Sequence, residues 1–499
     1  MSPVTMRGAF EPSILTIFGI TGDLSHRKLL PALYHLAEDG LLPKEMRIVG
    51  ISRNGTTVDE LLSKIQQSVE ATGVQCKQDA LDWLRGAISV ITMDLTKPEE
   101  YQRLKKELDA LEDSVGMCLH RLFYLSVPAN AFQPVVEQLG EQHLNNGCQH
   151  GHTESRLLIE KPFGSDMKSA TELIETLRHS FEEHQIYRID HYLAKETVQN
   201  ILRFRFENPI FNSDWGRDHI SSIMITAAES IGIEGRTSFY EGVGALRDLV
   251  QSHLLQILAL VTMDRPEQMK AEQIHQQKQK LFAAMQSPSS DEIGTSTVRG
   301  QYKSYRNEVE DDESQTETYA AIRVNIDNDR WRGVPMLIRT GKALTEKVTE
   351  VVITFQDPER KSSTNTLTIR VQPHEGIVLD LRIKKPGFDN DEIQHTQMSF
   401  CYAGTLGASH PDAYERVLVD AMRGDKTLFA TSSEVLDSWR VIDPILGAWQ
   451  KNEAPLETYE SGSWGPESAD TMVKKLGAKW LTGTPFVCSV QMKDEEPKS

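Results

Sequence analysis

The stretch ILTIFGITGDLSHRKLLPALYHLA, residues 14–37, decides the fold of the first part of the chain. An apolar run typical of a buried strand, Ile14–Gly19, leads directly into apolar residues at helical spacing, Asp23–Ala37. Glycines at such a junction let the backbone approach a pyrophosphate, which N–H groups at the helix N-terminus then bind. A tight turn without a ligand is the alternative, because the GxGxxG spacing is not met.

Similar strand-like runs recur in the first third of the chain, at Arg47–Ile51, Leu119–Val127 and Leu157–Ile159. Strands that alternate with helical segments over short connections predict a parallel, doubly wound sheet. We therefore expect a Rossmann-like domain over residues 10–196.

The remainder of the chain has a different pattern. Strand-like runs separated by long polar connections occur at Ile220–Ala227, Tyr319–Ile326, Val348–Phe355 and Thr366–Val371, and helical patterns at Leu246–Leu260 and Tyr414–Arg423. This mixture predicts a second, larger domain of strands and helices over residues 197–490. The acidic stretch Glu308–Glu317 is expected to be a solvated loop.

Composition excludes several classes of partner. The 499 residues include 54 Lys and Arg against 72 Asp and Glu, which gives a formal net charge of −18. Such a surface repels nucleic acids and anionic membranes, so neither is an expected partner. No apolar run approaches the ~20 residues that span a bilayer. Small anionic substrates remain possible wherever a local cluster of Lys and Arg overrides the overall charge.

The cysteines and the N-terminus suggest a cytoplasmic protein. Five dispersed cysteines, with no CxxC pair, are expected to be reduced thiols and to form no metal site. The first residues lack the basic start and apolar core of a secretory signal.

Three further segments carry candidate chemistry. Arg53 follows the second strand, where an arginine can pair with the 2′-phosphate of NADP; a surface arginine without a role is the alternative. Lys161 lies in the turn EKPFG, residues 160–164, which either presents it at the carboxyl edge of the sheet or leaves it solvated. In RIDHYLAKE, residues 188–196, a helix would bring His191 and Lys195 to one face, suited to a phosphate dianion. The alternative is an ordinary amphipathic helix start.

His253 lies within the apolar helical segment RDLVQSHLLQ, residues 247–256. A single histidine on such a face is more often a core residue than a catalyst, and the local sequence does not decide between the two.

Taken together, these motifs resemble the glucose-6-phosphate dehydrogenase family. The resemblance extends from about residue 14 to about 446 and also includes EGR (Glu234–Arg236), RWRGVPMLIRTGKAL (Arg330–Leu344) and PDAYERVLVD (Pro411–Asp420). It implies a Rossmann-like coenzyme domain, a β+α domain with a mainly antiparallel sheet, and homodimers or homotetramers. It also implies oxidation of glucose 6-phosphate at C1 with hydride transfer to NADP.

The resemblance assigns a role to each matching residue. His253 matches the general base, and Asp190 the carboxylate that orients it. The substrate-binding positions match Lys161, His191, Lys195, Glu229, Asp248, Lys342 and Lys347, and the coenzyme-binding positions match Gly19, Thr21, Gly22, Asp23, Leu24, Arg53 and Lys161. Arg339 and Arg370 match two basic positions of a second NADP site found in some animal members, but Val348 replaces a third, which disfavours that site.

Two rival interpretations are less consistent with these residues. A dehydrogenase of the glucose–fructose oxidoreductase type would also have a Rossmann domain and an EKP turn, but it does not explain Lys195, Lys342 and Lys347. A homologue that kept the fold and lost activity would be expected to lack Asp190 or His253, and both residues are present.

Overall fold

The computed structural model describes residues 10–148, 153–211, 215–357, 364–386, 392–402 and 411–483. Its contacts divide the chain into two compact units. Unit 1 comprises Met1–Ala194, Gln268–His275 and Pro411–Leu436, and unit 2 comprises Lys195–Glu267, Gln276–His410 and Asp437–Ser499. The sequence had suggested two continuous domains, whereas in the structure two later segments return to the first unit.

Unit 1 is built on a seven-stranded sheet in the order β16-β6-β5-β4-β1-β2-β3. Neighbouring strands are parallel, except that β16 is antiparallel to β6. The strands are β1 (Ser13–Phe18), β2 (Arg47–Ser52), β3 (Ile88–Thr92), β4 (His120–Leu125), β5 (Ser155–Ile159), β6 (Ile186–Ile189) and β16 (Phe429–Ala430). Without β16 this is the 3-2-1-4-5-6 order of dinucleotide-binding domains. The predicted doubly wound sheet is confirmed.

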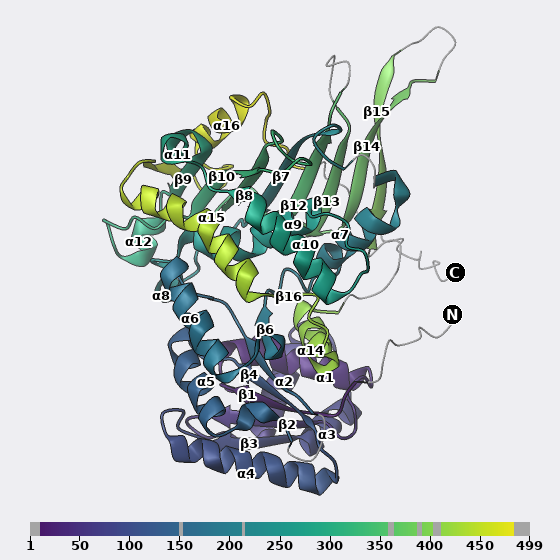
Figure 1. Cartoon of the computed structure of the whole chain (residues 1–499), viewed down its shortest axis with the longest axis vertical. Coiled ribbons are helices and arrows are strands. Elements are labelled where there is room, and N and C mark those ends of the chain that lie inside the picture. The colour runs from purple at the N-terminus through teal and green to yellow at the C-terminus, as the bar shows by residue number, and fades with distance from the viewer. Residues whose placement is uncertain are drawn as a thin grey trace, which may run out of the picture. The chain divides into compact units, whose positions relative to one another are not determined.

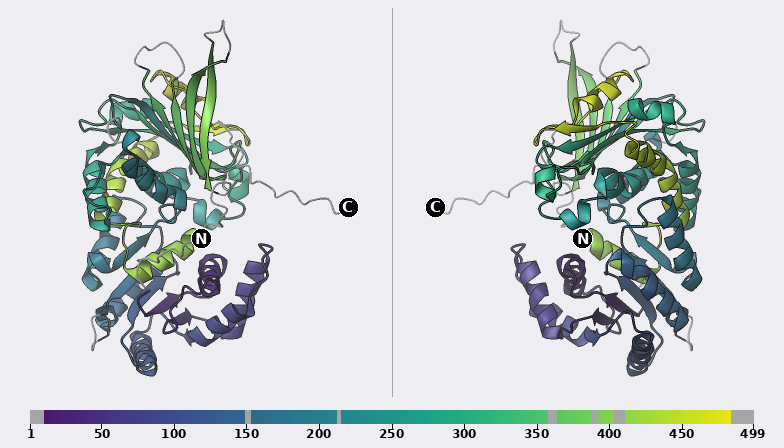
Figure 2. Two further views of the ribbon diagram at one scale, coloured as in Figure 1. Left: turned by 90° about the vertical axis from the view of Figure 1, so that its right-hand side faces the viewer. Right: turned by 90° about the vertical axis from the view of Figure 1, so that its left-hand side faces the viewer.

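Two groups of helices cover the sheet of unit 1 on opposite sides (Figures 1 and 2). One group comprises η1 (Ser25–Leu29), α1 (Leu30–Glu38), α2 (Val58–Glu70), α3 (Gln78–Ala87) and α14 (Ala413–Arg423). The other comprises α4 (Pro98–Val115), α5 (Phe132–Glu141) and α6 (Met167–Ser180). Because both faces are covered, every residue of β1 is buried.

Helix α14 joins unit 1 although it lies more than 200 positions beyond β6 in the sequence. Asp412 caps it by accepting the backbone N–H of Tyr414 (2.9 Å), and Gly424 ends it in the left-handed conformation. Its buried face packs into the apolar core that α1 also lines. At its C-terminal end, the buried Arg156 donates to the carbonyl oxygens of Ala421 (2.8 Å) and Met422 (2.9 Å).

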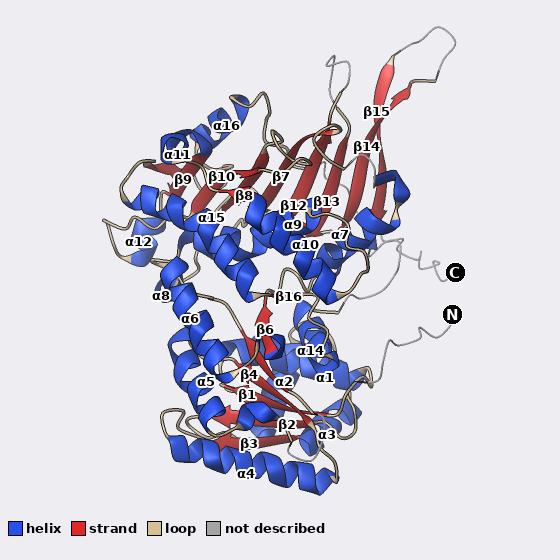
Figure 3. Ribbon diagram, in the orientation of Figure 1, coloured by secondary structure: helices blue, strands red, loops and turns tan. Residues whose placement is uncertain are grey.

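Unit 2 is built on a larger, mainly antiparallel sheet in the order β15-β14-β13-β12-β7-β11-β10-β9-β17, with β8 beside β10 (Figure 3). Only two of its pairs, β11–β7 and β17–β9, are parallel. The strands are β7 (Ile220–Ala228), β8 (Met285–Gln286), β9 (Thr297–Tyr302), β10 (Tyr319–Ile326), β11 (Met336–Gly341), β12 (Val348–Phe355), β13 (Thr366–Gln372), β14 (Gly376–Lys384), β15 (Ile393–Cys401) and β17 (Leu456–Tyr459). The predicted β+α architecture is confirmed.

Apart from short 3₁₀ turns, the remaining helices lie mainly in unit 2. They are α7 (Glu196–Glu207), α8 (Thr237–Tyr240), η6 (Leu246–Leu254), α9 (Leu255–Thr262), α10 (Ala271–Ala284), α11 (Ile293–Ser296), α12 (Tyr305–Val309), α15 (Ser432–Gln450) and α16 (Glu467–Lys474). Of these, η6 packs against β7 and β11, and α7 packs against β13. No helix within the described residues is long and apolar enough to cross a bilayer.

The structure corrects the expectations for an acidic stretch and for two cysteines. Glu308–Glu317 is not simply a solvated loop, because α12 includes its start and Glu317 at its end is buried. Cys118 and Cys148 are not reduced thiols: they form a disulfide, with Cα atoms 5.6 Å apart. These cysteines precede the neighbouring parallel strands β4 and β5, which brings them together at one end of the sheet.

Candidate active site

The glycine turn after β1 lies at the point where the strand order of unit 1 reverses. Gly19 has a φ of +84°, and a Cβ atom there would lie 2.3 Å from the carbonyl oxygen of Ser126, which follows β4. Only glycine fits this close approach of two strand ends. Ser25 Oγ ties the two ends together by donating to the carbonyl of Gly19 (2.9 Å) and to Ser126 Oγ (3.1 Å).

The helix that follows this turn suits a pyrophosphate. The helical backbone begins at Asp23, two residues before η1, and its first hydrogen bond runs from the N–H of His26 to the carbonyl of Gly22 (3.0 Å). Its first N–H groups are therefore oriented for an anionic ligand at the carboxyl edge of the sheet, where open α/β folds bind dinucleotides. The predicted coenzyme residues Gly19, Thr21, Gly22, Asp23 and Leu24 all belong to this turn and helix start. These features fit a nicotinamide dinucleotide.

Arg53 is exposed directly after β2, the strand beside β1. Thr21 Oγ1 lies 3.4 Å from the hydroxyl of Ser52. The β2 end and the glycine turn are thus adjacent, which brings Arg53 to the same sheet edge as the turn.

Lys161 follows β5, and the residue before it is unusual. Glu160 is half-buried, and its Oε1 accepts the hydroxyl of Tyr124 at 2.5 Å. Burial raises the pKa of Glu160 to about 7; the Tyr124 hydrogen bond opposes this shift, and the charge of Asp190 adds to it. Glu160 therefore holds a proton over part of the neutral pH range.

The segment after β6 is a turn and not a helix. Asp190, 1% exposed, accepts the N–H of Tyr192 through Oδ1 (3.0 Å), and its carbonyl accepts the N–H of Leu193 (3.0 Å). Helix α7 begins only at Glu196, with Lys195 as its N-cap residue. The expectation that His191 and Lys195 share one helix face is therefore wrong, because the boundary between the units falls at Ala194 and Lys195.

His191 and Lys195 belong to different units. In unit 1, the His191 ring lies near the ring of Tyr414, with centroids 6.5 Å apart. In unit 2, the ammonium group of Lys195 donates to Gln372 Oε1 at the end of β13. The predicted joint role of the two residues in binding phosphate stays a prediction.

His253 lies in η6, whose turns are wider than those of an α-helix. Single π-helical segments inside helices often occur at functional sites. The His253 side chain is only 3% exposed. On the same helix, Gln251 donates to Ser438 Oγ of α15 at 2.8 Å, which helps to fix the helix that carries the histidine.

Glu229 and Lys342 meet because of strand register. The two residues directly follow β7 and β11, a parallel pair in which Ala228 lies opposite Gly341. The ammonium group of Lys342 contacts Glu229, lies 3.8 Å from Asp248 Oδ2 of η6, and stands 4.8 Å from the ring centroid of Tyr240. The lysine side chain is 6% exposed, whereas those of Glu229 and Asp248 are 31% and 24% exposed.

Lys347 reaches the same edge from β12. Val348, the first residue of β12, lies opposite Ala228, so Lys347 is next to the start of the Glu229 segment. Lys347 is exposed. The described residues contain no group of three or more His, Cys, Asp or Glu side chains arranged to hold a metal ion.

Two family models match consecutive parts of this chain. The NAD binding domain of glucose-6-phosphate dehydrogenase matches residues 16–200, and its C-terminal domain matches residues 202–481. The chain belongs to the glucose-6-phosphate dehydrogenase family. It is thus an oxidoreductase of carbohydrate metabolism whose N-terminal domain binds a nicotinamide dinucleotide.

Individual members of the family are similar over nearly their whole length. The glucose-6-phosphate 1-dehydrogenase of Treponema pallidum is 38% identical over 98% of this chain and 100% of its own. The crystal structure of the Mycobacterium avium enzyme has a TM-score of 0.82 and 36% identity, covering 96% of this chain and 99% of that one. A glucose-6-phosphate dehydrogenase solved in complex with glucose 6-phosphate has a TM-score of 0.88 and 32% identity, covering 96% of this chain and all of that one.

The structure also identifies residues around the site that the family motifs alone did not indicate. Tyr124 donates a hydrogen bond to Glu160 beside Lys161, and Gln372 bonds Lys195 although it lies 177 positions away in sequence. Tyr240 packs under the ammonium group of Lys342. No local pattern pointed to these partners, because each contact depends on how distant strands pair.

The two arginines that match the second NADP site of some family members have partners within the chain. Arg339 lies between the rings of Trp464 and Trp480, 4.5 and 4.7 Å from their centroids. Arg370 pairs with the buried Glu350 at 2.8 Å. Because these contacts are internal, both arginines have a structural role here without a bound nucleotide.

Proposed function

We propose that this chain oxidises the C1 hydroxyl of β-D-glucose 6-phosphate to 6-phospho-D-glucono-1,5-lactone, with hydride transfer to NADP⁺. This is the first step of the oxidative pentose phosphate pathway and the activity after which its family and relatives are named. The observation that carries the proposal is the cluster of Lys342, Glu229 and Asp248 beside the helix that holds His253.

His253 is the proposed general base. As the hydride leaves C1, an imidazole nitrogen takes the proton of the C1 hydroxyl, and the carbon–oxygen bond becomes a carbonyl. An imidazole suits this task because its ordinary pKa lies close to neutral pH. Asp190 is proposed to orient the imidazole and to stabilise the imidazolium that forms.

The substrate is proposed to bind at the sheet edge of unit 2. Glu229 and Asp248 are held by Lys342, yet both remain partly exposed and can accept hydrogen bonds from sugar hydroxyls. His191, Lys195 and Lys347 are proposed to bind the phosphate dianion, for which cationic donors form strong, charge-assisted hydrogen bonds.

The coenzyme is proposed to be NADP, bound at the glycine turn of unit 1. When bound, its nicotinamide ring supplies the hydride acceptor. The first N–H groups of the helix that begins at Asp23 would hold the pyrophosphate, and Arg53 the 2′-phosphate, while Lys161 would lie between coenzyme and substrate. The exposed position of Arg53 beside the turn supports this choice.

The decisive experiment replaces the base. We expect His253→Asn to lower kcat by several orders of magnitude and to change KM for glucose 6-phosphate little, because proton removal belongs to the transition state. Asp190→Asn should cost less, since the imidazole remains. Reduction of NADP⁺ followed by absorbance gives both constants. Near-normal turnover of His253→Asn would show that His253 is not the general base.

We also propose that the chain forms a homodimer or homotetramer. β15 is an edge strand, and exposed apolar side chains gather on it and on β14: Ile383, Ile393 and Met398 are 45%, 62% and 64% exposed. Exposed apolar edges commonly pair with another chain. Light scattering after gel filtration tests this proposal, and a mass of one chain would contradict it.

The proposed location is the cytoplasm. A dianionic sugar phosphate does not cross a bilayer unaided, so the enzyme and its substrate must share a compartment. Fractionation of the source cells, with detection of the chain in each fraction, tests this.

A further inference from the structure

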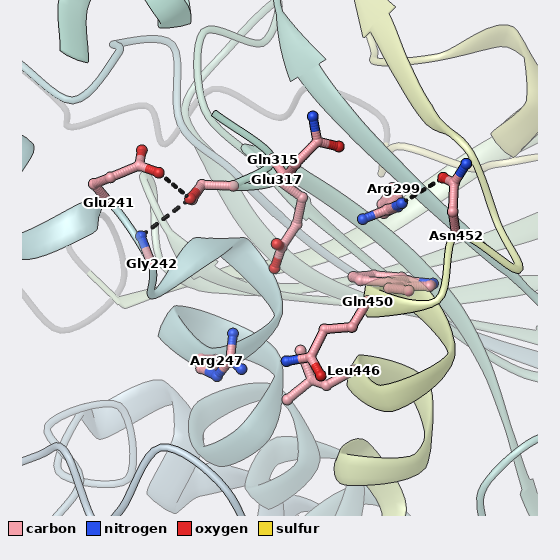
Figure 4. Close-up of a pocket in the computed structure, with 11 residues that line it drawn as sticks. Glu241, Gly242, Arg247, Arg299, Gln315, Glu317, Leu446, Gln450 and Asn452 are labelled. Carbon is pink, nitrogen blue, oxygen red and sulfur yellow. Dashed lines mark hydrogen bonds between the residues drawn. The ribbon is translucent and has the colours of Figure 1, made fainter. Parts of the chain in front are cut away.

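A second polar pocket lies in unit 2, lined by the start of η6, by β9 and by the C-terminal end of α15 (Figure 4). Its volume is about 340 Å³. The floor is charged: Arg299 of β9 and Glu317 are buried, and Arg247 of η6 lines the pocket beside them. The indole of Trp449, 2% exposed, supplies an apolar wall. The residues proposed above for substrate and coenzyme do not line this pocket, so the reaction leaves these charges unexplained.

Arg299 is held in place before any ligand arrives. Its Nε donates to the carbonyl of Ala454 and its Nη2 to Asn452 Oδ1, each at 2.9 Å. These bonds fix the plane of a guanidinium group that is only 5% exposed. Binding an anion to such a side chain costs little further conformational entropy.

Glu317 is the acid that faces both arginines. Its Oε1 accepts the N–H of Leu246 at 3.1 Å, and a Cβ atom on Gly244 would lie 2.4 Å from the carboxylate, so glycine makes room for it. Burial raises the pKa of Glu317 to about 7, against the lowering effects of the Leu246 N–H, Arg247 and Arg299.

The other acid of the pocket is already satisfied. Glu241 accepts hydrogen bonds from the hydroxyl groups of Tyr305, Ser314 and Thr316, at 2.7–3.1 Å. When Glu317 holds a proton, Glu241 is the remaining carboxylate among the residues that line this pocket, and its charge is spread over three donors. The exposed rim carries neutral amides, from Gln315, Gln450 and Asn452.

We propose that this pocket binds a small molecule whose oxyanion, a carboxylate, sulfate or phosphate group, pairs with Arg247 and Arg299 while its less polar part rests on Trp449. Guanidinium groups bind such planar or tetrahedral oxyanions through paired N–H donors. An anion beside Glu317 favours the protonated carboxyl, so binding takes up a proton. The affinity therefore rises as the pH falls through about 7.

The pocket is connected to the substrate site through short stretches of backbone. Thr318, next to Glu317, accepts the N–H of Lys342 at 2.9 Å, and Arg247 directly precedes Asp248. A ligand that shifts Glu317 or Arg247 therefore alters the group that holds the sugar, and it changes KM for glucose 6-phosphate. This regulatory consequence rests on the proposed function, whereas binding itself does not.

Equilibrium dialysis with radiolabelled inorganic sulfate tests the site, because sulfate keeps the same charge between pH 6 and 8. The Lys195→Ala variant removes sulfate binding at the proposed substrate phosphate site. In that background Gln450→Trp fills the pocket from an exposed rim position, and the neighbouring, exposed Lys451→Trp adds the same indole outside its lining. We expect Gln450→Trp to weaken sulfate binding at least about tenfold and Lys451→Trp to leave it unchanged.

The outcomes separate the two proposals. Sulfate binding that Lys195→Ala alone abolishes would overturn the pocket and support the phosphate site. Binding that survives Lys195→Ala and is lost with Gln450→Trp supports the pocket, and equal effects of both tryptophans would overturn it. In the Lys195→Ala background, affinity should rise as the pH is lowered from 8 to 6. The conservative Glu317→Gln should abolish that rise, and a persisting rise would overturn the role of Glu317.

Discussion

At the scale of single residues, the half-buried carboxyl of Glu160 links the active-site region to the pH dependence of stability. In the folded chain its pKa is about 7, against an ordinary value of 4.5. The folded state therefore holds this proton over a range in which the unfolded state has lost it. The stabilisation of the folded state by this proton is complete below about pH 4.5 and is lost as the pH rises through 7. It is on the order of 3 kcal/mol.

Glu160→Gln should remove this dependence while keeping an acceptor for Tyr124. We expect the difference in the free energy of unfolding between Glu160→Gln and wild type to be more positive at pH 8 than at pH 5. Urea titrations at both pH values measure it. Glu107→Gln, at an exposed position of α4, is the control and should change neither value. An equal effect of Glu160→Gln at both pH values would contradict the half-buried, protonated carboxyl.

Arg53 is the residue that we propose to select the coenzyme. Hydrogen bonds to charged groups contribute about 1.5–3 kcal/mol, roughly 10- to 150-fold in affinity. We expect Arg53→Ala to lose most of the preference for NADP⁺ and to retain activity with NAD⁺, whereas Asn54→Ala, on the next exposed residue, keeps the preference. The ratio of kcat/KM for the two coenzymes is the measurement. An unchanged ratio would exclude Arg53 from the coenzyme site.

The sequence motifs suggested roles for single residues, but they did not indicate which side chains contact those residues. His253, Asp190 and Lys342 follow from the resemblance to one family. The contacts of Lys342 with Glu229 and Asp248, and of Lys195 with Gln372, depend on strands that pair across long separations. Burial of Glu317 at the end of an acidic run could not be predicted either, because charge alone favours a solvated loop.

At the scale of elements, regular burial made some strands easy to predict. β10 and β12 have the predicted bounds, because most of their residues are buried and are apolar or β-branched. β15 was not identified: most of its residues are exposed and polar, so the alternation that marks a strand is missing. The helix expected at His191 fails for a different reason, since the chain passes from one unit to the other there.

The turn between β1 and η1 gives the element-scale prediction. Gly19→Ala should destabilise the chain more than Gly73→Ala and should abolish coenzyme binding. Both glycines have a φ of +84°, but a Cβ at Gly73 meets nothing within 4 Å, whereas at Gly19 it meets the Ser126 carbonyl. Gly73→Ala thus measures only the cost of the left-handed backbone, about 1–2 kcal/mol. Thermal unfolding with and without NADP⁺ compares the two variants, and equal losses would refute the close approach.

At the scale of the whole molecule, unit 1 is completed by residues from late in the chain. Besides α14, residue Ser432 bonds the buried Arg188 at 2.8 Å, and β16 pairs with β6. A fragment of residues 1–200 lacks these contacts and leaves the apolar face of α1 without its cover. We expect it to bind a hydrophobic dye and to unfold without cooperativity. The same fragment joined to residues 411–436 through a Gly/Ser linker should unfold cooperatively, and cooperative unfolding of residues 1–200 alone would contradict this account.

The late arrival of residues 411–436 also sets an order of events on the ribosome. Translation proceeds at about 5–20 residues per second, so the stretch from Ala194 to Leu436 takes roughly 10–50 s to synthesise. During that interval the nascent first unit exposes the apolar surface that α14 later buries. The chain is therefore expected to engage chaperones until synthesis has passed Leu436, and the coenzyme domain, although it begins at the N-terminus, matures among the last parts of the protein.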